Sequence, residues 1–238
     1  MIKVENIETW GFEHAIRGMR NPMNSWERSD SQIMWTDAPA FNDIGRPDLA
    51  MNMVIGENDL ALMRKLYAAG QPHRKYLRQI FVSMDITAPL YWWKEFDTYK
   101  VGTTANSCST MHKIAAKEFS LDDFSHEHLF DGIETIEDSG NDMEHYENPT
   151  TCMEYVIAVL NHYRTKFNDT KDKRYWWQMI QLLPSSYNQR RTVTMSYENV
   201  MNILDYRQGH KLDEWNEYCK ILLGLPHVAE IRAVTQKG

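Results

Sequence analysis

Three arginines flank a strand-like segment and the helix-like segment that follows it. Arg190 and Arg191 precede an alternation of apolar and polar residues over 192–196, the period-two pattern of a half-buried strand. Apolar residues then recur at helical spacing over 197–207, and Arg207 ends that pattern. Guanidinium groups offer N–H donors in a planar fork that matches phosphate oxygens. A strand and a helix with cations at both ends are typical of one wall of a nucleotide site.

Arg207 has two interpretations. At a helix C-terminus a cation is stabilised by the helix dipole, so capping alone could explain it. A ligand-binding cation is the other interpretation, and both stay open.

A second polar segment follows Gly102. Its hydroxyl and amide groups could hold an anion, and the lysine before it offers a point charge to a phosphate. The same residue types are common at helix N-caps and on solvated helices, so that interpretation stays open too. The candidate binding residues of this segment are Lys100, Thr103, Thr104 and Asn106.

Two further groups carry weaker signals. His126, Glu127 and His128 lie near a pair of aspartates, but they lack the helical spacing of the HExxH motif, which favours a surface loop over a metal site. Cys108 with His112 one turn later lacks an orienting third group, which favours a buried structural thiol. The tryptophan pairs, which are expected in the core or at an interface, are Trp92-Trp93 and Trp176-Trp177.

Composition limits the classes of function. The chain has 238 residues, 42% of them hydrophobic and 25% charged, which is ordinary for a folded protein. A formal charge of −7 argues against an extended nucleic-acid surface. Three distant cysteines indicate a reducing compartment, and the absence of a targeting signal or a long apolar run favours a cytoplasmic protein without a membrane segment.

The elements that would position these residues form one α+β domain over 1–238, with helices packed on a small mixed or antiparallel sheet. The acidic stretch 120–149 is expected to be a loop with one or two short helices, serving as a lid or an insertion. Strands are predicted over about 2–4, 80–87 and 192–196, and helices over about 11–19, 57–69, 90–96, 109–119, 151–166, 173–180, 197–207 and 212–223.

Two stretches resemble the flavin-dependent thymidylate synthases. In that family Leu-Pro opens a strand that leads to a helix of pattern Asn-x-Arg-Ser-Leu-x-x-Phe-Leu-x-x-Arg; here Leu183-Pro184 precedes the strand and 196–207 forms the helix. Upstream, a helix that ends at Gly70, a turn with His73, and a strand that ends in Ala88-Pro89 follow the family's order. The signature Arg-His-Arg-x-x-Ser-x-Asn-Glu falls on residues from Thr98 to Asn106. The two matches cover roughly 57–117 and 182–222.

The resemblance implies an enzyme that carries out reductive one-carbon transfer to C5 of a pyrimidine deoxynucleotide, dUMP or a related nucleotide. It implies FAD, with NADPH and methylene-tetrahydrofolate as co-substrates, in a homotetramer. In this interpretation Arg207 stabilises negative charge on the pyrimidine. Substrate contacts would come from Lys100, Thr103, Thr104, Ser109, Arg190 and Arg191, and flavin contacts from His73, Asn106 and Asn202.

The signature is degenerate in this chain. Lys100 is the one cation left of the signature arginines, Tyr99 stands at the histidine, and Glu198 replaces an arginine associated with the flavin. A carboxylate there is expected to repel flavin phosphates. The alternative function is therefore a non-catalytic nucleotide-binding protein that senses or sequesters its ligand, and a purely structural oligomer is the third.

Overall fold

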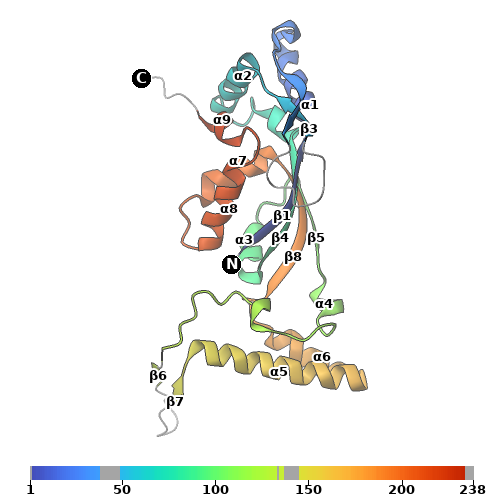
Figure 1. Cartoon of the computed structure of the whole chain (residues 1–238), viewed down its shortest axis with the longest axis vertical. Helices are drawn as coiled ribbons and strands as arrows, with labels where there is room; N and C mark the ends of the chain where they lie inside the picture. Colours follow the sequence, from blue (N-terminus) through green and yellow to red (C-terminus); the bar gives the residue numbers. More distant parts are fainter. Residues whose placement is uncertain (1, 38–48, 133, 137–144, 234–238) are drawn as a thin grey trace. The chain divides into compact units, whose positions relative to one another are not determined.

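The structure is a computed structural model, and it describes residues 2–37, 49–132, 134–136 and 145–233. Helices and strands are interspersed along the chain (Figure 1). Contacts divide the chain into two compact units. The smaller unit contains 87–96 and 107–190, and the larger unit contains 2–86, 97–106 and the chain from Arg191 on.

The main sheet has four strands in the order β1-β4-β8-β5. The alternation that predicts the second strand is observed in β4, where Val82, Met84 and Ile86 are at most 1% exposed. This sheet and its helices confirm the predicted α+β class. The strands are β1 (Lys3–Trp10), β4 (Phe81–Pro89), β8 (Asn188–Ser196) and β5 (Thr103–Ser107).

Helices of the larger unit cover a core centred on α7, whose apolar residues are buried. The predicted stop at Gly70 is confirmed, because its φ of 92° is the left-handed conformation that glycine tolerates after a helix. Contacts join α7 to α8 and α2 to α9. The elements are α1 (Phe12–Arg20), α2 (Glu57–Ala68), the 3-10 helix η3 (Lys75–Arg78), α7 (Tyr197–Arg207), α8 (Asp213–Leu223) and α9 (Val228–Arg232).

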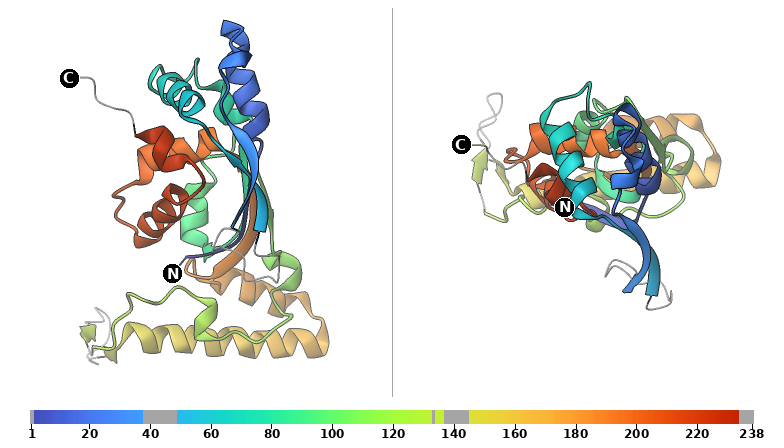
Figure 2. Two further views of the ribbon diagram at one scale, coloured as in Figure 1. Left: turned by 45° about the horizontal axis from the view of Figure 1, so that its top comes forward. Right: turned by 90° about the horizontal axis from the view of Figure 1, so that it is seen from above.

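The larger unit also contains a two-stranded ribbon that the sequence did not predict. Strands β2 (Gln32–Asp37) and β3 (Leu49–Val54) pair antiparallel, with Ile33 opposite Met53. Figure 2 shows them as a long curved ribbon. Two short 3-10 helices, η1 (Asn21–Met23) and η2 (Trp26–Arg28), lie between α1 and β2. The turn signals at Ala38-Pro39 and at 45–47 lie outside the described residues.

In the smaller unit, α5 packs along α6 (Figure 1). Their apolar faces enclose a core that includes Phe119, Phe124, Leu160 and Met179. Trp92 and Trp93 are buried, as predicted; Trp92 stacks on Phe96, and Trp93 makes an edge contact with the same ring. The elements are α3 (Leu90–Phe96), α4 (Thr110–Lys113), η4 (Leu121–Asp123), β6 (Glu134–Ile136), β7 (His145–Glu147), α5 (Pro149–Thr170) and α6 (Lys173–Leu182).

Three local predictions are wrong. The polar turn expected after Gly102 continues as edge strand β5, because its backbone groups pair in the sheet. The helix expected over 109–119 is a single turn, α4, and the following residues join the apolar core instead. Cys108, expected to be buried, is exposed. In the acidic stretch the helix expectation is met by η4, and 133 and 137–144 lie outside the described residues.

Among the described residues, no helix combines the length and apolar character needed to cross a bilayer.

Candidate functional site

The α7 helix carries a charged cluster on the face that meets η3. Glu198 accepts two hydrogen bonds from Arg78, from Nε to Oε2 and from Nη2 to Oε1, the latter at 3.2 Å. Arg74 Nε lies 3.7 Å from Oε1 of the same carboxylate. Arg74 also donates from Nη2 to Asn202 Oδ1 at 3.0 Å. Because Glu198 and Asn202 are one helical turn apart, both side chains face the two arginines.

This cluster changes the expectation for Glu198. The Glu198 side chain is 11% exposed, and a buried carboxylate needs a compensating charge. Arg78 and Arg74 provide two positive charges against one negative, so the cluster is cationic by one unit. The predicted repulsion of flavin phosphates by Glu198 is therefore offset by its neighbours.

Arg207 lies in an aromatic seat at the other end of α7. Its guanidinium carbon is 4.7 Å from the centre of the Trp215 ring and 5.7 Å from that of Tyr99. Nε donates to the Tyr99 hydroxyl at 3.0 Å, and Nη1 lies 3.3 Å from His210 Nε2. Cation–π stacking and these contacts orient the guanidinium group.

The start of β5 is tied to α7 through a buried amide. Asn199 Nδ2 donates to the carbonyl of Val101 at 2.6 Å and to Thr103 Oγ1 at 2.7 Å. Gly102, with a φ of 72°, makes the turn between these two acceptors. Thr103 is thus held beside α7, whereas Lys100, Thr104 and Asn106 are exposed.

The remaining candidate residues are exposed or contact other protein groups. Arg191 Nη1 lies 2.8 Å from Asp97 Oδ1. The Arg190 side chain is exposed, and its carbonyl accepts from Cys108 N at 2.9 Å. Ser109 Oγ accepts from His112 N at 3.1 Å, which is a helix N-cap contact. His73 is exposed in the turn before η3. Arg190 and Ser109 belong to the smaller unit, and Arg191 and His73 to the larger.

Within the larger unit, α7 thus contacts or carries three residues of the predicted set. Asn202 and Arg207 belong to the helix, and Thr103 of β5 is bound to it through Asn199. The residues that sequence reasoning missed are the partners that hold them. A signal for two of them was available, because arginines four residues apart beside the His73 turn lie on one side of a helical segment. The missed residues are Arg74, Arg78, Tyr99, Asn199, His210 and Trp215.

The possible metal ligands at 122–128 have protein partners. His126 Nδ1 lies 2.8 Å from the Phe124 carbonyl, and Glu127 accepts from Ser125 Oγ at 2.8 Å. Asp123 accepts from Lys117 Nζ at 2.6 Å. In the described part of the chain, no three His, Cys, Asp or Glu side chains are grouped so as to hold a metal ion.

The fold is similar to that of flavin-dependent thymidylate synthases, as the sequence resemblance predicts. Thymidylate synthase X from Helicobacter pylori, solved with FAD and dUMP, is 15% identical with a TM-score of 0.63, and the match covers 100% of both chains. The UMP/dUMP methylase PolB from Streptomyces cacaoi, solved with 5-Br UMP, is 12% identical with a TM-score of 0.58, over 97% of this chain and 92% of that one. At these identities the similarity establishes the fold.

The similarity is found by comparison of structures and not by comparison of sequences. No protein-family model matches the chain, and no curated protein matches it.

Proposed function

We propose that this chain is a flavin-dependent enzyme of the thymidylate synthase type, which transfers a one-carbon unit reductively to C5 of a pyrimidine deoxynucleotide, dUMP or a related nucleotide. The fold is shared with an enzyme solved with FAD and dUMP and with a UMP/dUMP methylase. The observation that carries the proposal is the pairing of Arg74 and Arg78 with Glu198 beside Asn202. It restores positive charge on the side of α7 where the resemblance expects the flavin.

The residues of this cluster fit FAD in charge and in hydrogen-bonding type. FAD carries a diphosphate, and arginine is well suited to phosphate oxygens. Arg74 Nε is buried without a hydrogen-bond partner among the described residues, so the cluster has a donor that its internal contacts leave unused. Arg74, Arg78 and Asn202, with His73 and Asn106, would hold the cofactor. The flavin, when bound, supplies reducing chemistry, and NADPH and methylene-tetrahydrofolate are the proposed co-substrates.

Arg207 would act on the pyrimidine. A guanidinium stabilises negative charge that develops on a carbonyl oxygen of the ring, and the Tyr99 hydroxyl and the Trp215 ring hold it in a fixed orientation. A preoriented donor loses little entropy when the substrate arrives. The proposed substrate contacts are Lys100, Thr103, Thr104, Ser109, Arg190 and Arg191.

A second candidate is a nucleotide-binding protein without catalysis. It is favoured by Tyr99, which stands at the histidine of the family signature and whose hydroxyl accepts from Arg207. An arginine engaged in this way can bind an anionic ligand without turnover. We further propose that the chain forms a single domain, assembles as a homotetramer and is located in the cytoplasm.

The test is flavin content followed by activity. Purified protein, saturated with FAD, is expected to show a bound flavin absorption spectrum and dUMP-dependent oxidation of NADPH. Arg74→Gln combined with Arg78→Gln should lose the flavin, whereas Arg28→Gln, whose side chain is 77% exposed, serves as the matched control. Flavin and dUMP binding without NADPH oxidation would favour the second candidate. No binding of either molecule would overturn both.

A further inference from the structure

The larger unit contains a cavity of 540 Å³ that includes none of the residues assigned above to flavin or nucleotide. Cavities of this size accommodate small organic ligands. Its apolar lining comes from Ile16 of α1, Met53 of β3 and Trp26 of η2. The polar lining consists of Glu13, Arg17, Arg20, Asn21, Ser29 and Ser31.

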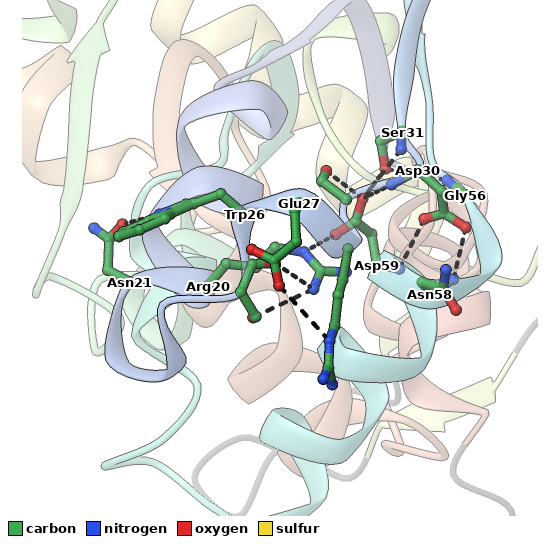
Figure 3. A network of polar contacts seen from close by, with 12 residues as sticks. Arg20, Asn21, Trp26, Glu27, Asp30, Ser31, Gly56, Asn58 and Asp59 are labelled. Carbon is green, nitrogen blue, oxygen red and sulfur yellow. Dashed lines mark hydrogen bonds and ion pairs between the residues drawn. The ribbon is translucent and has the colours of Figure 1, made fainter.

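The tryptophan in this lining is an exposed ring with a fixed orientation. Trp26 is 51% exposed, and its indole Nε1 donates to Asn21 Oδ1 at 2.8 Å (Figure 3). The exposed apolar surface of the indole is unfavourable in water, and a ring stacked on it would bury that surface. Because Asn21 uses its oxygen for this bond, its amide nitrogen remains a donor for another partner.

Three of the lining residues, Arg20, Ser29 and Ser31, donate hydrogen bonds to the buried Asp59 carboxylate. Oδ1 accepts from Arg20 Nε at 2.6 Å, and Oδ2 accepts from Ser29 Oγ at 2.8 Å and from Ser31 Oγ at 2.7 Å (Figure 3). Backbone N–H groups of Asp30 and Ser31 add two bonds at 3.1 Å. The Asp59 carboxylate therefore has five donors, and one of them is Arg20.

Arg20 is the buried cation of the cavity. Its residue is 3% exposed, Nε is used by Asp59, and Nη1 donates to the carbonyl of Ser25 at 3.2 Å. Among the described residues no hydrogen bond engages its Nη2. The charge of Arg20 is balanced by Asp59, and its unused Nη2 favours a hydrogen-bond acceptor at the cavity wall. Arg17, which also lines the cavity, adds a second positive charge.

We propose that this cavity binds a small planar aromatic carboxylate, with its ring against Trp26, Ile16 and Met53 and its carboxylate toward Arg20 and Arg17. The planar ring matches the fixed indole, and the carboxylate matches the charge of Arg17 and the unused Nη2 donor of Arg20. Glu13, on the same lining, disfavours a phosphate, whose second negative charge would add repulsion. The site is separate from the proposed nucleotide site and does not depend on it.

The probe is 2-naphthoate, and 2-naphthalenemethanol is its neutral counterpart. Saturation-transfer NMR on the wild-type protein is expected to show binding of the acid, and weaker binding of the alcohol. Trp26→Ala should weaken binding of the acid at least about tenfold, which is about 1.4 kcal/mol of binding free energy. The matched control is Trp177→Ala. It removes another indole, which is 42% exposed and lies in the smaller unit, and it should leave binding of the acid unchanged.

Arg17→Gln separates the two parts of the proposal. Its side chain is exposed, so folding should be retained, and the preference for the acid over the alcohol should fall severalfold. Equal binding of acid and alcohol by the wild-type protein would overturn the carboxylate assignment. Equal binding by Trp26→Ala and wild type, or no binding at all, would overturn the site. Displacement of the naphthoate by dUMP or FAD would show that it is not separate from the nucleotide site.

Discussion

Asn202 and Arg207 lie on the same helix but on nearly opposite sides of it. At 100° per residue, five positions place them about 140° apart around the α7 axis. Asn202 accepts from Arg74 at 3.0 Å, and Arg207 donates to Tyr99 at 3.0 Å. Both positions match the family pattern. Within one chain, however, Asn202 contacts the arginine cluster and Arg207 contacts the aromatic side chains. Substitutions at each should have separable effects.

Arg207→Ala is expected to weaken dUMP binding by about 1.5–3 kcal/mol, the usual value for a hydrogen bond to a charged group. Loss of the stacking on Trp215 should lower stability by about 1 kcal/mol. Calorimetry measures the dUMP affinity, and urea unfolding measures the stability. Tyr99→Phe removes the hydroxyl that Arg207 contacts and keeps the ring, so it is the control for the orientation of the guanidinium group. Unchanged dUMP affinity with reduced stability would assign Arg207 a structural role.

Glu198→Gln should strengthen binding of FAD, because the two arginines then keep their full charge toward the diphosphate. Thermal stability should fall at the same time, since Arg74 is largely buried and would lack its counter-charge. Flavin titration and a melting curve measure both effects. Glu217→Gln, an exposed carboxylate of α8, is the control. Weaker FAD binding in Glu198→Gln would argue that the carboxylate itself contacts the ligand.

The sequence predicts most regular elements of this fold because their burial is periodic. β4 and α7 have uninterrupted apolar patterns, and both are found within a few residues of the predicted bounds. The β2–β3 ribbon was missed because its strands are separated by a segment rich in turn signals, so each strand is a short apolar run without clear alternation. β5 was missed because its residues are polar, as an exposed edge strand permits.

The candidate site was predictable only in part. Positions such as Arg207 follow from the family pattern, but their partners depend on contacts between distant segments. Tyr99 meets Arg207 across 108 positions, and Arg78 meets Glu198 across 120. No local pattern encodes such pairs, so the charge balance around Glu198 could not be derived from the chain alone.

Self-association is the next prediction. Ile33 and Met34 on β2 and Val54 on β3 are 51%, 48% and 41% exposed. Successive strand residues point to opposite faces, so both faces of this ribbon present large apolar side chains, which favours an interface. We expect a homotetramer by light scattering, which Ile33→Lys with Met34→Lys should shift to smaller species. Val101→Lys, an exposed apolar residue outside the ribbon, is the control. A wild-type monomer at micromolar concentration would contradict this expectation.

Asp59→Asn is expected to destabilise the larger unit by roughly 3–5 kcal/mol, because it leaves Arg20 as a buried cation without its carboxylate. Burial raises the pKa of the Asp59 carboxyl, but hydrogen bonds from Ser31, Ser29 and Arg20 outweigh burial and lower the pKa below its usual value. A carboxyl whose pKa is lowered by folding contributes stability that is complete above its unfolded pKa of about 3.9 and is lost as the pH falls through the folded value. The difference in unfolding free energy between wild type and Asp59→Asn should thus be constant above about pH 5 and narrow below about pH 4. Urea unfolding from pH 3 to pH 7 measures it, with the exposed Asp169→Asn of α5 as the control. A difference that does not change with pH would show that Asp59 is not the titrating group.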